Sequence, residues 1–158
     1  MLTPHVPRIE LFLEIAAPME KVFDLSRSID VHQASQAKHR ERAIAGRTAG
    51  LIEAGEEVTW EATHLGYRQK LTSRITAFDR PNHFRDSMVR GAFRRFDHDH
   101  YFEPLGPDRT RMRDVFDYTA PCGVLGRLAD RLFLQRYMRT LLAGRNAAIK
   151  AIAESANC

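Results

Sequence analysis

The chain has 158 residues, 44% of them hydrophobic and 28% charged, which is the balance of a globular protein of one domain. Its two cysteines, Cys122 and Cys158, form no CxxC pair, so neither a disulfide scaffold nor a zinc–thiolate site is expected, and a reducing cytoplasm is the expected location. The net charge of +4 comes from scattered arginines that usually lie beside acidic residues, which argues against a nucleic-acid partner.

The chain shows no basic segment followed by an apolar core near its start, and no run of about 18 apolar residues anywhere. We therefore expect neither an export signal nor membrane insertion. No internal repeat, low-complexity tract or linker divides the chain. We expect a single domain over 1–158, with frayed ends at 1–7 and 155–158.

The first part of the chain predicts a strand followed by two short helices. Apolar and polar residues alternate over 9–15, the pattern of a half-buried strand. Pro18 suits the first turn of an amphipathic helix that continues over 19–25. A second helix is predicted over 28–38, with Asp30 as its N-cap. Its predicted inward-facing positions are Val31 and Ala34.

From residue 42 onward the pattern is that of an antiparallel meander. A short strand near 42–45 is followed by turn points at Gly46, Gly50 and Gly55. Further strands with alternating polarity are predicted over 56–64, 69–75, 84–90, 96–102 and 112–118.

One face of these strands carries both apolar and polar side chains. Its apolar members are Trp60, Leu71, Ile75, Phe84, Met88, Phe96, Phe102, Met112, Phe116 and Tyr118. Its polar members are His64, Gln69, Ser73, Asp86, Arg90, His98, His100 and Asp114. A polar group that is buried dry and unpaired costs about 2–7 kcal/mol. So many polar groups do not fit a closed apolar core, and we expect a hollow lined by them.

The last segment, 121–154, predicts one helix of about eight turns, roughly 45 Å long at 1.5 Å per residue. So long an apolar stripe needs a cover, and the simplest one is a single curved antiparallel sheet. The predicted fold is therefore α+β, with about six or seven strands wrapped around the long C-terminal helix and two short helices after the first strand. Apolar residues recur along this helix at spacings of three, four and seven through Leu125, Leu128, Leu132, Leu142 and Ile149.

This order of elements resembles the START-like (SRPBCC) superfamily, which joins birch-pollen-allergen-like proteins, polyketide cyclase/dehydratases and lipid-transfer domains. The likeness lies in 9–25, where an Ile-x-Leu-x-Leu strand runs into APMEKVF, and in the helix over 121–154. The sequences GEEVTW at 55–60 and FxHxHxF at 96–102 are similar to stand-alone bacterial members. The resemblance implies a helix-grip fold, whereas its functions range from carriers to cyclases. The chain matches no residue set that defines one of the enzymes.

Strand register predicts a ladder of histidines and aspartates. If the hairpin loop between the strands over 84–90 and 96–102 has three residues, Asp86 lies opposite His98. A loop of about six to nine residues before the next strand sets His100 opposite Asp114. An aspartate fixes the tautomer of a histidine and raises its basicity, so the ladder can pair strands, anchor a ligand or move protons.

Several functions follow from this ladder and stay open. The pairs could serve strand register alone. They could anchor the polar end of a small hydrophobic or amphipathic ligand that the chain carries without catalysis, between the sheet and the last helix. The candidate ligand-binding residues are Trp60, His64, Ser73, Asp86, Met88, His98, His100, Asp114, Phe116 and Tyr118.

Two alternatives are an enzyme and a protein-interaction module. A polyketide cyclase/dehydratase-like enzyme would use His98 or His100 as the base and Asp86 or Asp114 as the orienting group. The hypothesis of a protein-interaction module is supported only by the basic surface and by the family resemblance. The identity of the ligand and the oligomeric state are not predicted.

A metal and a cofactor are not predicted. The imidazoles of a His-x-His strand point the same way, and Asp114 or His64 could complete a zinc site, but this short pattern alone is weak. No glycine-rich phosphate loop is present, because Gly144 lies inside the predicted helix with no strand before it.

Overall fold

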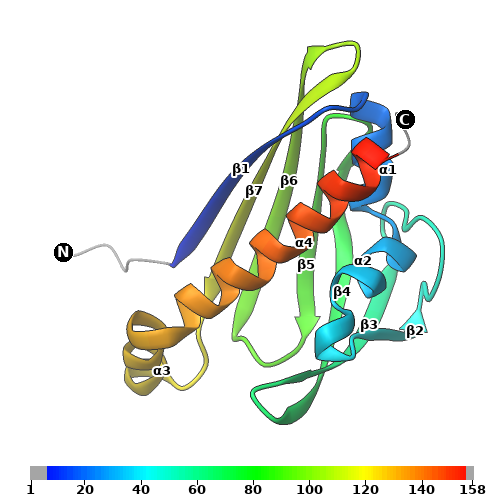
Figure 1. The fold of residues 1–158 in the computed structure, drawn as a ribbon. Coiled ribbons are helices and arrows are strands. Elements are labelled where there is room, and N and C mark those ends of the chain that lie inside the picture. Colours follow the sequence, from blue (N-terminus) through cyan, green and yellow to red (C-terminus); the bar gives the residue numbers. More distant parts are fainter. Residues whose placement is uncertain (1–6, 156–158) are drawn as a thin grey trace.

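The computed structural model describes residues 7–155, which fold into one sheet and a set of helices (Figure 1). The strands are β1 (Arg8–Ile15), β2 (Arg42–Gly46), β3 (Glu57–His64), β4 (Tyr67–Asp79), β5 (His83–Arg90), β6 (Arg95–Gly106) and β7 (Arg109–Thr119). The helical segments are α1 (Met19–Ser26), α2 (Ile29–Ser35), the 3₁₀ turn η1 (Ala37–His39), α3 (Gly123–Ala129), the π-helical η2 (Asp130–Leu134) and α4 (Gln135–Ser155).

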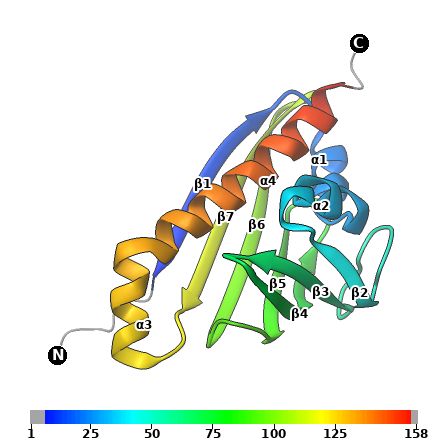
Figure 2. The same ribbon diagram turned by 60° about the horizontal axis from the view of Figure 1, so that its bottom comes forward.

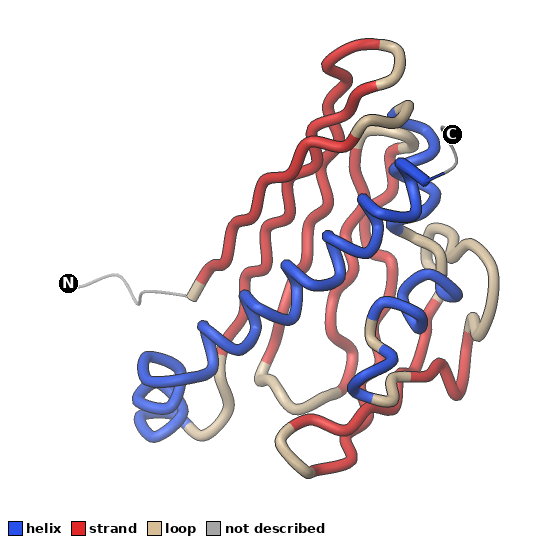
Figure 3. Tube along the Cα trace, in the orientation of Figure 1, coloured by secondary structure: helices blue, strands red, loops and turns tan. Residues whose placement is uncertain are grey.

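The seven described strands form one antiparallel sheet in the order β1-β7-β6-β5-β4-β3-β2. The sheet curves around α4, which crosses its concave face (Figure 1). The helices α1 and α2 lie beside the C-terminal part of α4, away from α3 (Figures 1 and 3). Consecutive strands from β3 to β7 are joined by hairpins, and β1 pairs with β7 to complete the sheet. The predicted α+β fold, a curved sheet wrapped around a long C-terminal helix, is confirmed.

The C-terminal helix is interrupted, whereas the sequence predicts one regular helix over 121–154. Asp130–Leu134 is π-helical, and α3 turns away from the axis of α4 (Figure 2). The buried Asp130 carboxylate accepts a hydrogen bond from the Tyr118 hydroxyl, which holds this turn inward. A π-turn changes which side chains face the sheet. Leu125, Leu128 and Leu132 are therefore exposed, although they belong to the predicted covered stripe.

The start of α3 requires a glycine at position 126. A Cβ atom there would lie 1.6 Å from the carbonyl oxygen of Pro121. The covered stripe begins further on, where Met138, Leu142 and Ile149 of α4 are buried against the sheet.

One end of the sheet is closed by α1 through a cluster of aromatic rings. Phe23 makes edge contacts with Phe78, Phe84 and Phe102, at centroid distances of 5.5, 5.4 and 5.3 Å. Burying one such ring contributes about 1.5–3 kcal/mol. This end of the fold is a filled apolar core, which confines any hollow to the rest of the concave face.

The second short helix differs from the prediction in its cap and its inner face. Ser28, not Asp30, is the N-cap, because its Oγ accepts a hydrogen bond from the backbone N–H of Val31. Asp30 instead accepts a hydrogen bond from the backbone N–H of Gly50. Ala34 is exposed, and Val31 packs against the core.

The predicted frayed ends lie mostly outside the described residues. Two of their residues are described: the Pro7 carbonyl accepts a hydrogen bond from the N–H of Tyr118, and the Ser155 hydroxyl donates to the carbonyl of Ile152. Among the helices within 7–155, none has the length and apolar character needed to cross a membrane.

Candidate functional site

A cavity of about 310 Å³ lies between the concave face of the sheet and α4. Its wall is mostly apolar and is formed by β3 to β7, α2 and the first half of α4. Pockets for small molecules usually enclose about 300–1,000 Å³, so this cavity has room for a compact ligand. Of the predicted ligand-binding residues, those on its wall are Trp60, His64, Ser73, Asp86, His98, His100 and Phe116.

Three predicted ligand-binding residues do not line the cavity. Met88 packs against a group of buried apolar residues that includes Phe96 and Phe116. Asp114 is buried beside the imidazoles of His98 and His100 without lining the cavity. Tyr118 is buried with its hydroxyl on Asp130. Arg90, which the sequence places on the inner face, is exposed because β5 ends there.

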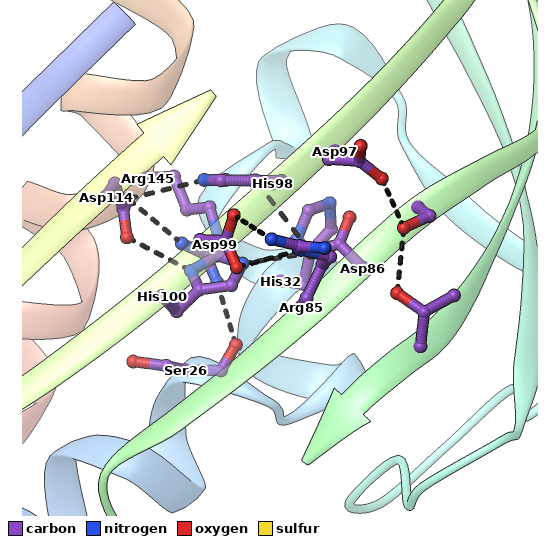
Figure 4. A network of polar contacts seen from close by, with 12 residues as sticks. Ser26, His32, Arg85, Asp86, Asp97, His98, Asp99, His100, Asp114 and Arg145 are labelled. Carbon is purple, nitrogen blue, oxygen red and sulfur yellow. Dashed lines mark hydrogen bonds and ion pairs between the residues drawn. The ribbon is translucent and has the colours of Figure 1, made fainter. Parts of the chain in front are cut away.

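His100 is at the centre of a polar cluster on the cavity wall (Figure 4). Its Nδ1 donates to Asp114 Oδ1 at 3.0 Å and its Nε2 donates to Asp86 Oδ2 at 2.9 Å. Both acceptors are carboxylates, so both ring nitrogens carry protons and the ring is an imidazolium. Burial alone would lower the pKa of His100, but the carboxylates of Asp114 and Asp86 outweigh burial and raise it.

The register of this cluster is as predicted, but one of its hydrogen bonds is not. Asp86 lies opposite His98 and Asp114 lies opposite His100. Asp86 nevertheless bonds diagonally to His100, and its Oδ2 stays 3.9 Å from Nδ1 of His98. Diagonal neighbours in an antiparallel sheet are within reach of a ring of this size. Asp114 holds the His100 ring so that Nε2 points back to β5.

His98 has no hydrogen bond through its ring to any residue within 7–155. Its Nε2 is 3.7 Å from Asp114 Oδ2, and both atoms are buried without a hydrogen-bond partner among the described residues. Burial lowers the pKa of His98, and the neighbouring charge of His100 lowers it further. His98 is therefore a neutral imidazole with one N–H and one free lone pair. This group is available to a molecule in the cavity.

Arg145 of α4 completes the cluster and is absent from the predicted site. Its buried guanidinium donates to the carbonyl of Ser26 at 2.7 Å and lies 3.7 Å from Asp114 Oδ2. Its position could have been found from the sequence by its spacing, because Arg145 follows Leu142 by three residues and precedes Ile149 by four. Those positions place Arg145 on the buried stripe of α4.

The charges of the cluster balance. Asp86 and Asp114 are anionic, and His100 and Arg145 are cationic. Burial acts to raise the pKa of both carboxyls, but His100 outweighs it, lowering the pKa of Asp86 and bringing that of Asp114 well below its usual range. Pairing of this kind offsets part of the cost of burying each charge. Neutral His98 is left as the polar group without a pairing role.

A second polar group lies on the wall around Trp60. The His32 ring packs on Trp60 with centroids 4.3 Å apart and ring planes tilted by 33°, and its Nε2 is 2.6 Å from Glu41 Oε1. His64 Nδ1 is 2.8 Å from the Tyr137 hydroxyl, and burial lowers the pKa of His64. The predicted site covers strands only, so it misses the members that come from α2, the loop before β2 and α4.

The outer face of the same strands carries a histidine–aspartate pair of a different kind. His83 Nε2 is 2.6 Å from Asp99 Oδ1. Arg85 donates to both oxygens of Asp99, at 2.9 and 3.1 Å. Asp99 is thus fully used by surface partners, whereas the inner cluster leaves the His98 ring free.

Solved structures with the same fold cover almost the whole chain. The protein TTHA0849 from Thermus thermophilus is 21% identical, has a TM-score of 0.71 and covers 94% of this chain and 100% of its own. The Zhui aromatase/cyclase from Streptomyces sp. R1128 is 12% identical, with a TM-score of 0.67 and coverage of 96% and 98%. A norcoclaurine synthase point mutant from Thalictrum flavum, in complex with a transition-state analogue, is 12% identical, with a TM-score of 0.72 and full coverage of both chains. Identities this low show a shared fold alone.

A search of curated proteins gives no significant match. A family model described as polyketide cyclase/dehydrase and lipid transport matches residues 7–154. This match runs from β1 to within one residue of the end of α4. The START-like resemblance read from the sequence is confirmed, and the chain belongs to the polyketide cyclase/dehydrase and lipid transport family.

Proposed function

We propose that the chain binds a small, largely hydrophobic molecule with one oxygen-bearing end, and releases it unchanged. The observation that carries this proposal is a mostly apolar cavity in which one buried side chain, His98, has no hydrogen bond to any of the residues that the structure describes. Trp60, Phe96 and Phe116 supply apolar wall for the body of the ligand. The His98 ring can then hydrogen-bond to the oxygen.

Membership of the family supports a hydrophobic ligand but does not separate a carrier from an enzyme. The charge balance of the cluster favours the carrier. His100 is held on both sides, so both of its nitrogens are engaged in structural pairing. The predicted alternative in which the ladder merely fixes strand register accounts for His100, Asp86 and Asp114, but not for His98.

A thermal-shift screen with a cavity-filling variant tests the proposal. Fatty acids, isoprenoids, flavonoids and aromatic polyketides are added to the wild type, to Ser73→Phe and to Thr76→Phe. Ser73 is buried on the cavity wall, whereas Thr76 on the same strand is exposed. At least one ligand class should raise the Tm of the wild type and of Thr76→Phe, and should leave Ser73→Phe unchanged.

Two outcomes of this screen contradict the carrier proposal. One is the absence of stabilisation of the wild type by any class. The other is an equal response of both phenylalanine variants, which would place binding outside the cavity. A protein-interaction module would bind its partner through a surface outside the cavity. Ser73→Phe should leave that partner binding unchanged, whereas it should abolish small-ligand binding in the cavity.

A cyclase/dehydratase-like enzyme is the second candidate, and the neutral ring of His98 favours it. A general base needs a free lone pair, which His98 has and the doubly protonated His100 lacks. The sequence leaves open whether His98 or His100 is the base, and the free lone pair favours His98. His98→Gln should abolish turnover of a polyketide substrate and change its affinity only a few-fold. Unchanged turnover in that variant would exclude His98 as the base, and a wild type without turnover would contradict the enzyme.

A further inference from the structure

We propose that Asp86, His98 and His100 bind a divalent transition-metal ion, such as zinc or iron(II), on the polar wall of the cavity. One donor atom from each residue lies within 4.8 Å of the other two. Asp86 Oδ2 is 2.9 Å from Nε2 of His100 and 3.9 Å from Nδ1 of His98. Donors held about 2.0–2.1 Å from a tetrahedral zinc ion are roughly 3.3 Å apart. Small side-chain rotations therefore convert the present arrangement into a coordinating one.

The donor set suits such an ion. Two imidazoles and one carboxylate are ligands of zinc and of iron(II) sites that keep open positions. The two imidazoles project from one face of β6, with ring centroids 3.9 Å apart. From the sequence, Asp114 or His64 would be the third ligand, and no metal is predicted. The structure instead places Asp86 of β5 beside both imidazoles, and we revise that expectation.

Asp114 is placed as the supporting carboxylate of this site. A histidine that binds a metal through one nitrogen usually donates its other N–H to a carboxylate. Asp114 Oδ1 is 3.0 Å from Nδ1 of His100, and Asp114 Oδ2 is 3.7 Å from Nε2 of His98. One carboxylate thus faces the two nitrogens that point away from Asp86.

The metal also gives a role to two buried atoms that have no partner within 7–155. These atoms are Nε2 of His98 and Oδ2 of Asp114. Coordination through Nδ1 of His98 fixes the tautomer with the proton on Nε2. That proton then faces the free oxygen of Asp114, and a small rotation closes the hydrogen bond.

The ion would take the place of the proton that His100 shares with Asp86. The exchange leaves one net positive charge in the cluster, since Arg145 and Asp114 keep theirs. All three ligand residues line the cavity, so the remaining coordination position is open to it. Water or an anionic ligand oxygen in that position would balance the charge. The site does not depend on the proposed hydrophobic ligand, because the ion alone can be tested. With the ion bound, both nitrogens of His98 are engaged, and an oxygen of the ligand would bind the ion in place of the His98 ring.

The test is a titration of chelator-treated protein with Zn²⁺ by calorimetry and with Co²⁺ by visible absorption. We expect one ion per chain and the d–d bands of cobalt bound by nitrogen and oxygen. Asp86→Asn and His98→Gln should each weaken binding at least tenfold. Asp114→Asn, which removes only the supporting carboxylate, should weaken it by about 10–100-fold. His83→Gln, which breaks the outer histidine–aspartate pair, is the matched control and should bind as the wild type does.

A measurement on the wild type covers the case in which these variants fail to fold. Zinc should shift the ring ¹⁵N resonances of His98 and His100 in the NMR spectrum and leave that of His83 in place. The proposal is overturned if the wild type binds no ion, if ring resonances of His98 and His100 do not respond, or if folded Asp86→Asn and His98→Gln keep the affinity of His83→Gln.

Discussion

His98 and His100 lie two residues apart on one face of β6, with ring centroids 3.9 Å apart, yet they differ in charge. Two carboxylates raise the pKa of His100, whereas burial and the charge of His100 lower that of His98. One histidine therefore stabilises the sheet as an imidazolium. The other is neutral, has no hydrogen bond through its ring to any described residue, and lies on the wall of the cavity.

Loss of the Asp114 carboxylate should destabilise the fold strongly. Asp114→Asn leaves His100 and Arg145 buried with one carboxylate between them, and breaking a buried pair costs about 3–5 kcal/mol. Urea unfolding at neutral pH measures this loss. The control is Asp117→Asn on the same strand, whose partly exposed ion pair with Arg95 should contribute less than about 1 kcal/mol. Equal losses in the two variants would mean that the inner cluster has no special structural role.

The contact between Tyr118 and Asp130 should stabilise the bend between α3 and α4. Tyr118→Phe removes the hydroxyl that donates to the buried Asp130 carboxylate, and an unsatisfied buried acceptor costs about 1–3 kcal/mol or more. The double variant Tyr118→Phe/Asp130→Leu removes both polar groups and should recover part of this loss. Additive losses on thermal unfolding would show that the two residues are not coupled.

Two glycines of the C-terminal helices should respond to alanine with opposite signs. Gly126→Ala places a methyl group against the Pro121 carbonyl and should destabilise the protein. A Cβ at Gly144 meets no atom of residues 7–155 within 4 Å, so Gly144→Ala in α4 should stabilise by up to about 1 kcal/mol. Unfolding curves of both variants check the signs. Stabilisation by Gly126→Ala would show that the start of α3 is placed incorrectly.

Much of the sheet and of the inner cluster follows from strand periodicity. Alternation assigns Trp60, His98 and His100 to the concave face, and hairpin length sets Asp86 opposite His98. The bend at Asp130 does not follow in this way, because a helical stripe carries no sign of a contact to a distant tyrosine.

Other features depend on tertiary contacts that no local pattern encodes. Ser28 caps α2 because Asp30 is engaged by the loop at Gly50. The spacing of Arg145 places it on the buried stripe of α4, but its partners, Asp114 and the Ser26 carbonyl, come from distant parts of the chain. The single-domain organisation over 1–158 and the cytoplasmic location stay predictions.

Acid should weaken the link between α1 and the loop after β4. Asp24 accepts hydrogen bonds from Arg80 at 2.7 Å and from Arg27 at 2.9 Å, which lower its pKa. A carboxyl whose folded pKa lies below its unfolded value of about 3.9 contributes stability above that value and loses it as the pH falls through the folded pKa. Asp24→Asn should therefore cost roughly 1 kcal/mol at neutral pH, with a difference from the wild type that shrinks below about pH 4.

Urea unfolding of the wild type and Asp24→Asn over this pH range measures the difference. A gap that stays constant or grows toward acid would contradict the assignment of the pKa shift to Asp24.

The most direct test of ligand binding is native mass spectrometry of the chain, purified under mild conditions from the cells that make it. The wild type should carry an additional small-molecule mass that is removed by organic extraction, and Ser73→Phe, whose new ring fills the cavity, should carry none. Identical bare masses for the two proteins, or the same adduct on both, would contradict the account of the cavity as a binding site.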